Sequence, residues 1–121
     1  MAEVRPADEW DFVRFYGPVQ ITSRWVGRAM WRGMAVVGFG GLIETAEGEW
    51  LAFLEVPEDE RRPHIFRHVL GAFAEAKAQG ATVIRAHCDT RIPRADTLLA
   101  RLGLKPTEEV IDERVVWVWQ N

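Results

Sequence analysis

The order of apolar and polar segments across residues 49–104 constrains the fold of this chain more than any other feature. Trp50–Val56 is an apolar segment of strand length, and a charged turn follows it. The apolar residues of the next segment, Pro63–Gln79, recur with helical spacing, and Ala81–Cys88 is again apolar and of strand length. A helix that connects two strands of one sheet makes them parallel. We therefore expect the strands near 50–56 and 81–88 to be parallel neighbours.

The segments on either side of this unit predict further strands and helices. Short turns join three strand-like segments, Ser23–Met30, Met34–Thr45 and Trp50–Val56. Three strands joined in this way predict an antiparallel meander. The glycines at 38, 40 and 41 indicate a bulge or a close backbone approach within the second of these strands. The other predicted elements are a short edge strand at Glu3–Arg5, one helix capped by Asp8, a helix over Pro93–Leu102 and a last strand or hairpin within Val110–Trp119.

Together these elements predict the α+β class, with a mixed, mostly antiparallel central sheet, one parallel pair of strands and helices on the faces of the sheet. The length of 121 residues fits one domain, 1–121. The net charge of −3 gives no support for a nucleic-acid partner. The apolar runs are far shorter than the roughly 20 residues of a membrane helix, and the N-terminus lacks a signal-peptide pattern. We therefore expect a cytoplasmic protein without a nucleic-acid or membrane partner.

The chain resembles the GNAT superfamily of acyl-CoA N-acyltransferases over nearly its whole length. VRPADEWDF is similar to the opening of many members, and Leu102-Gly103-Leu104 is similar to the end of their last helix. The strand, basic turn, helix and strand between them match the half of the family fold that binds the cofactor. The family usually has two helices near the N-terminus, whereas this sequence predicts one. The resemblance implies a GNAT-like fold and transfer of an acyl group to an amine of a small molecule or protein.

The resemblance also implies where coenzyme A would bind. A helix N-terminus offers unpaired N–H groups and the positive end of the helix dipole, which suit the pyrophosphate. The pantetheine arm would pair with the backbone where the preceding strand ends. The implied cofactor residues are Leu54, Val56, Arg61, Arg62, His64 and Arg67.

The cofactor turn nevertheless departs from the family pattern. Members usually have Arg or Gln, two free positions, Gly, one free position, and then Gly or Ala. Here Arg61 leads, but His64 and Phe66 occupy the positions of the small residues. Small residues let the backbone approach the cofactor closely. Two outcomes stay open: a functional anion site, or a charged loop in which residues 58–60 pair with the arginines and Phe66 plugs the cleft.

Glu55 is the best candidate for a general base. Alternation along the strand places Leu51, Phe53 and Glu55 on one face, so the carboxylate would emerge at the edge of an apolar face. The alternative is an ordinary surface carboxylate at a strand end. Many members carry a tyrosine as general acid at the position of Leu99, and the only tyrosine here, Tyr16, lies in the first predicted helix. A catalytically eroded relative, or pseudoenzyme, therefore remains an alternative.

Two weaker constellations involve histidine and cysteine. A zinc site would require the histidines at 64 and 68 to converge with His87, Cys88 and Asp89. A nucleophilic Cys88 would need a base within hydrogen-bond reach, and adjacent strand residues point to opposite faces. A small buried residue is the better interpretation of Cys88, and we predict no metal site.

Six tryptophans leave a non-catalytic role open. If helices do not cover the sheet surface that carries them, this surface predicts a protein partner or a homodimer; the residues concerned are Trp25, Trp31, Trp117 and Trp119. The chain also resembles short GNAT-like proteins of tailed phages, in the segments at Pro18, Ser23-Arg24, Pro57-Glu58 and Arg61-Arg62. That resemblance implies protein–protein contacts in virion assembly, in the host cytoplasm or the virion, instead of acyl transfer.

Overall fold

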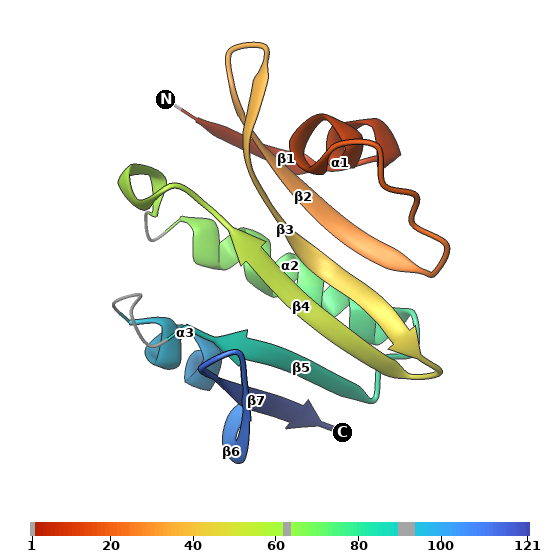
Figure 1. Cartoon of the computed structure of the whole chain (residues 1–121), viewed down its shortest axis with the longest axis vertical. Helices are drawn as coiled ribbons and strands as arrows, with labels where there is room; N and C mark the ends of the chain where they lie inside the picture. The colour runs from red at the N-terminus through yellow and green to blue at the C-terminus, as the bar shows by residue number, and fades with distance from the viewer. Residues whose placement is uncertain (1, 62–63, 90–93) are drawn as a thin grey trace.

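The computed structural model describes residues 2–61, 64–89 and 94–121. In these ranges the chain forms one seven-stranded sheet, three α-helices and a short 3-10 helix, η1 (Figure 1). The elements in chain order are β1 Glu3–Pro6, α1 Glu9–Tyr16, β2 Trp25–Arg32, β3 Ala35–Ala46, β4 Glu49–Glu55, η1 Glu58–Glu60, α2 Ile65–Ala78, β5 Val83–Cys88, α3 Ala95–Arg101, β6 Lys105–Ile111 and β7 Arg114–Gln120.

The sheet order is β1-β2-β3-β4-β5-β7-β6, and every neighbouring pair is antiparallel except β4 and β5. The parallel pair is joined by α2, which crosses one face of the sheet (Figure 1). This arrangement confirms the predicted α+β class and the predicted parallel neighbours. The single helix α1 before β2 also agrees with the prediction of one helix in that region.

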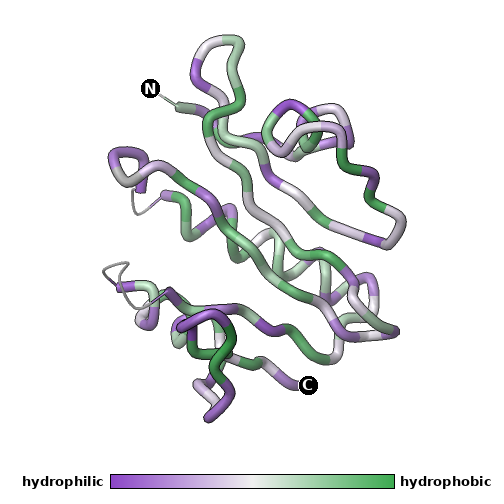
Figure 2. Tube along the Cα trace, in the orientation of Figure 1, coloured by the Kyte–Doolittle hydropathy of each residue, from purple (hydrophilic) through white to green (hydrophobic). Residues whose placement is uncertain are grey.

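The two faces of the sheet are covered by different helices. Trp50 of β4 and Ile84 of β5 are fully buried in the main hydrophobic core, where they meet Phe73 of α2. Residues of α3 pack against the same cluster. Phe53 alternates to the opposite face, where α1 packs on β2 and β3 through aromatic side chains. Figure 2 shows hydrophobic residues running along the central strands between these two layers.

Asp8 caps α1 as predicted. The N–H of Asp11 donates to the Asp8 carboxylate at 2.9 Å, and the N–H of Asp8 donates to the Asp11 carboxylate at 3.1 Å. This reciprocal pair satisfies two donors that a helix start leaves open. At the other end of the fold, the Gly80 N–H donates to the Lys77 carbonyl at 3.0 Å as α2 ends, so Gly80 is the predicted C-terminal stop.

Several element boundaries differ from the predicted ones. β2 runs to Arg32 because its pairing with β3 continues beyond a bulge between Met30 and Trp31. The predicted last strand or hairpin is the hairpin β6–β7, but β6 begins at Lys105, where it pairs with Val118. All seven residues of β6 are exposed, so its sequence lacks the apolar alternation that identifies a half-buried strand. None of the described helices is long and apolar enough to cross a bilayer.

We expect alanine substitutions at two glycines to change stability in opposite directions. A Cβ at Gly41 would clash with the Val26 carbonyl oxygen, and Gly41→Ala should lower the free energy of unfolding by about 1–3 kcal/mol. At Gly71, inside α2, the nearest atom is 3.6 Å away, so Gly71→Ala should raise it by roughly 0.5–1 kcal/mol. Urea unfolding measures both changes. Equal effects at the two sites would contradict the close approach of β2 and β3.

Candidate active site

The parallel strands β4 and β5 separate at their carboxyl ends. In the described part of the chain, their pairing ends at Ala52 and Ala86. Residues 53–55 continue to pair with β3, while residues 87–88 pair with β7 on the other side. Beyond Ala52, one row of backbone N–H and C=O groups of β4 therefore faces the gap between β4 and β5. This agrees with the prediction for the segment around Leu54–Val56. Open sheets of this kind bind ligands at the carboxyl ends of their parallel strands.

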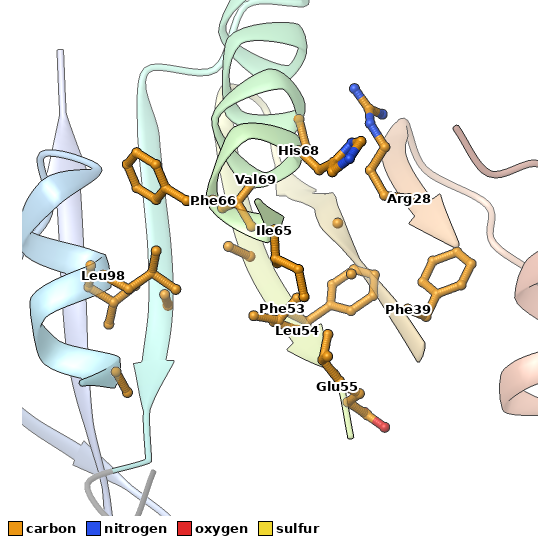
Figure 3. Close-up of a pocket in the computed structure, with 18 of the residues that line it drawn as sticks. Arg28, Phe39, Phe53, Leu54, Glu55, Ile65, Phe66, His68, Val69 and Leu98 are labelled. Carbon is orange, nitrogen blue, oxygen red and sulfur yellow. The ribbon is translucent and has the colours of Figure 1, made fainter. Parts of the chain in front are cut away.

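A cavity of about 950 Å³ occupies this separation. It extends from the α2 face of the sheet to the α1 face. Most of its lining comes from β3, β4, the end of β5, α2 and α3, and a few residues of β1, α1, β2 and β7 also contribute. Figure 3 shows Phe53, Leu54 and Glu55 of β4 near the ring of Phe39 from β3 and the Ile65 side chain of α2. Its volume lies within the range of small-molecule sites, about 300–1,000 Å³.

The two sides of the cavity differ in charge. On the side of α2 and α3, the lining includes His68, Arg28, Arg61, Arg94 and Arg101. Near the end of β5 it also includes His87 and the ion pair of Asp89 with Arg114. On the side of α1, it includes phenylalanine rings and the exposed carboxylate of Glu55. An anion therefore fits the first side, and a cation fits the second.

The predicted cofactor residues at the end of β4 and just after it line the cavity. Leu54 is 45% exposed, and Val56 is buried against Met30 and Ile65. The Nε of Arg61 donates to the Val56 carbonyl at 3.0 Å, so this carbonyl is partly occupied by the chain itself. Arg61 lines the cavity. Arg62, also predicted as a cofactor residue, lies outside the described residues.

The acidic residues before Arg61 pair elsewhere. Arg32 at the end of β2 forms an ion pair with the buried carboxylate of Glu60 and another, at 3.5 Å, with Asp59. These two acids thus have a partner on β2, while Arg62, one of the two arginines that we expected them to pair with, lies outside the described residues. Their bond to β2 also connects the 3-10 turn η1 to the sheet, which positions the chain just before Arg61.

The start of α2 differs in part from the prediction. His64 is exposed and precedes the helix, with its ring centroid 6.4 Å from that of His68. Arg67 is exposed, but its backbone N–H already donates to the His64 carbonyl at 3.2 Å. This N–H, which we expected to face an anion, is used within the first turn. Burial, together with the positive charges of His64, Arg28 and Arg67, lowers the pKa of His68, so its imidazole is mainly neutral at neutral pH.

Phe66 does not plug the cleft. Its ring packs against the main core beside Leu98, and the guanidinium of Arg101 lies 4.1 Å from the ring centroid. Figure 3 shows the ring directed toward α3, away from Glu55. Phe66 thus forms part of a wall of the cavity, which remains open beside it. The physical reason is the helical turn, which places Phe66 on the side of α2 that faces α3.

Glu55 lies on the α1 face beside Tyr16. The cross-strand partner of Glu55 is Phe39, whose ring centroid is 5.7 Å from that of Tyr16. The Tyr16 hydroxyl is buried and has no partner at hydrogen-bond distance among the described residues. Burial raises the pKa of the Tyr16 phenol well above its ordinary value, and the nearby charge of Glu55 raises it further. Sequence reasoning missed this pairing because 39 positions separate the two residues and no local pattern joins them.

The other histidine and cysteine hypotheses fail. Among the described residues, no group of three His, Cys, Asp or Glu side chains is arranged to hold a metal ion. Cys88 is buried, and burial together with Asp96 and Asp89 raises the pKa of its thiol. A thiol is a poor nucleophile compared with a thiolate. Cys88 is therefore the small buried residue that we predicted.

The condition for a tryptophan-rich partner surface is not met. Trp25 lies beneath α1 with its ring 5.8 Å from Phe12, and Trp117 and Trp119 pack against the main core. Trp31 is partly buried, and the guanidinium groups of Arg5 and Arg14 each lie 5.6 Å from the centroid of its ring. Among these four residues, none stands on an uncovered sheet face, so their number reflects packing of the two layers.

Titration of Tyr16 tests the contact with Glu55. Since Tyr16 is the only tyrosine, near-ultraviolet absorbance of tyrosinate reports one group. We expect the folded protein to stay protonated at pH 10.0, the ordinary pKa of the phenol, and Glu55→Gln to lower the pKa only in part because burial remains. The stability that the raised pKa contributes is complete below pH 10 and decreases as pH rises above it. Half-ionisation of folded wild type at pH 10.0 would contradict the burial.

Comparison with known proteins identifies the fold. No protein-family model and no curated protein sequence matches the chain. The Bacillus subtilis acetyltransferase in complex with CoA aligns with a TM-score of 0.66 at 14% identity, covering 100% of this chain and 99% of that one. The ribosomal-protein-S18-alanine N-acetyltransferase of Escherichia coli gives 0.70 at 14% identity, covering 99% and 94%. The GNAT domain of S. lividans PAT gives 0.67 at 14% identity, covering 99% and 90%. These likenesses confirm the GNAT fold.

Proposed function

We propose that this chain, acting as one domain over 1–121 in the cytoplasm, is an acyl-CoA-dependent N-acyltransferase. The observation that carries the proposal is the cavity at the separation of β4 and β5, with basic side chains on one side and Glu55 on the other. A phosphate-rich cofactor fits the first side, and a protonated amine fits the second. A solved structure of the same fold supports a role for coenzyme A as the cofactor, because the B. subtilis acetyltransferase is in complex with CoA.

The cofactor side would hold coenzyme A at the turn before α2. Arg61 supplies positive charge at the cavity mouth, and Arg62, His64 and Arg67 complete the proposed set. The backbone at Leu54 and Val56 would face the pantetheine arm. The pairing of Asp59 and Glu60 with Arg32 supports this role of Arg61, because two nearby carboxylates are bound elsewhere.

On the acceptor side, Glu55 would be the general base. Coenzyme A, when bound, would supply the acyl group as a thioester. The neutral acceptor nitrogen would displace the thiolate, which would take the second proton from that nitrogen and leave as a free thiol. Glu55 takes the proton that the ammonium loses before the nitrogen can attack. We assign Tyr16 as a positioning residue, because its buried hydroxyl stays protonated near the charge of Glu55 and is an available hydrogen-bond donor. A thiolate leaves readily, so a tyrosine at the position of Leu99 is dispensable.

A non-catalytic role is the alternative outcome. A phage-type GNAT-like protein that acts in virion assembly, in the host cytoplasm or the virion, would have no need for the cofactor. Its support is the departure of the cofactor turn at His64 and Phe66 from the family pattern. The open cavity beside Phe66 argues for the enzyme over this alternative.

Calorimetric titration with coenzyme A tests the proposal. We expect a dissociation constant below about 1 mM, which corresponds to roughly 4 kcal/mol. Arg61→Ala should weaken binding by about tenfold or more, because a charge-assisted contact contributes about 1.5–3 kcal/mol. Arg14→Ala is the matched control, since this exposed arginine lies on α1. Wild-type binding weaker than 1 mM would remove the enzyme proposal and favour the non-catalytic alternative.

A further inference from the structure

The α1 face of the cavity is backed by a continuous cluster of aromatic rings. Their centroids lie 4.7–6.2 Å apart, which are distances of direct aromatic contact. Phe39, at the centre, is 1% exposed. The contributing residues are Phe12, Phe15, Tyr16, Trp25, Phe39 and Phe53.

Part of this cluster reaches the cavity. Phe15, Phe39 and Phe53 are among the lining residues. The rings of Phe39 and Phe53 are nearly parallel, at 2° and 6.2 Å between centroids. Phe53 stands on the segment of β4 that has left β5, so its ring borders the opening. Figure 3 shows these two rings on the same side of β4 as Glu55. The cavity therefore has a flat, rigid, apolar wall next to a carboxylate.

The charges around this wall select for a single cation. Glu55 is exposed, whereas Asp89 at the end of β5 lies 3.7 Å from the guanidinium of Arg114. The charges of Asp89 and Arg114 therefore offset each other. An ammonium at Glu55 thus finds a partner, whereas a second ammonium on the same molecule would meet Asp89 already paired with Arg114.

We infer that the acceptor is a primary amine carried by a short linker on a flat apolar ring, that is, an arylalkylamine. The ring stacks on Phe53, and the ammonium lies at Glu55. Residues two apart on one face of a strand are about 7 Å apart, so a linker of a few carbons joins the two positions. The inference rests on the proposed function, since it names the acceptor for that site.

Acetyl transfer to a set of amines, followed by release of free thiol, tests the inference. Phenethylamine should give a kcat/KM about tenfold or more above that of n-butylamine, and both should exceed spermidine and an alanine-terminated peptide. Phe53→Leu, which keeps an apolar side chain, should reduce the preference for phenethylamine over n-butylamine by about threefold to tenfold. Trp10→Leu is the control, because Trp10 is 72% exposed on α1 and should leave the preference unchanged.

Direct titration of the protein with phenethylamine alone separates this inference from the proposed function. Binding that Glu55→Gln abolishes and Phe53→Leu weakens would support the acceptor class even if coenzyme A fails to bind. Tight coenzyme A binding together with a preference for spermidine or the peptide would overturn the acceptor class and leave the enzyme proposal intact. Absence of phenethylamine binding and of its acetylation would also overturn it.

Discussion

Replacement of Glu55 by glutamine is expected to lower the rate of acetyl transfer by about 10²–10⁴-fold, while the dissociation constant for coenzyme A stays unchanged. The amide has nearly the shape of the carboxylate but cannot take a proton from the acceptor ammonium. Glu55 lies on the α1 face of β4, whereas the basic cofactor side lies toward α2 and α3. Steady-state thiol release and calorimetry on the same preparation measure the two quantities.

Glu49→Gln is the matched control for this result. Glu49 lies on the same face of β4 at the opposite end of the strand, where it is 3.6 Å from Arg85. We expect the Glu49 variant to keep the wild-type rate. Equal rates in wild type and the Glu55 variant, with acetylation present, would remove Glu55 as the base. Loss of coenzyme A binding in the Glu55 variant would instead place this carboxylate on the cofactor side.

Phe39→Ala is expected to lower the free energy of unfolding by about 3–5 kcal/mol. Phe39 is almost fully buried, and its ring contacts those of α1, β2 and β4, so truncation leaves a cavity that these elements cannot all close. Since domains are stable by only about 5–15 kcal/mol, this is a large part of the total. Urea unfolding at constant m value measures the loss.

Two further variants serve as comparisons for the stability of Phe39→Ala. Phe39→Leu keeps most of the buried volume and should lose clearly less stability, which allows a measurement even if the alanine variant does not fold. Trp10→Ala removes a larger aromatic side chain from an exposed position and should change stability by no more than about 0.5 kcal/mol. A loss below 1 kcal/mol for Phe39→Ala would show that the aromatic cluster does not hold α1 on the sheet.

Local sequence patterns were sufficient for most elements of the fold. Periodicity identified the strands β4 and β5 and the helix between them, and a connecting helix makes such strands parallel. Asp8 was identifiable as a cap because its partner Asp11 is only three residues away. Residues 105–109 escaped prediction, since β6 is exposed throughout and carries no buried alternation.

Several of the predicted site residues line one cavity at the end of β4, and their functional roles stay predictions. Strand alternation put Glu55 and Phe53 on one face, and the carboxyl ends of the parallel strands marked the cavity. The orientation of Phe66 was not predictable, because helical spacing gives the apolar side of α2 but not whether a given ring meets the cleft or α3.

What the sequence determined by itself is the set of elements and their order, because these depend on contacts between residues a few positions apart. The tertiary structure alone decided which distant side chains meet. Tyr16 reaches Glu55 only because α1 packs on the aromatic face of β3 and β4. Arg32 holds Glu60 only because β2 extends beyond its bulge. Such contacts depend on how helices dock on a sheet and where strands separate, and no local pattern of residues encodes them.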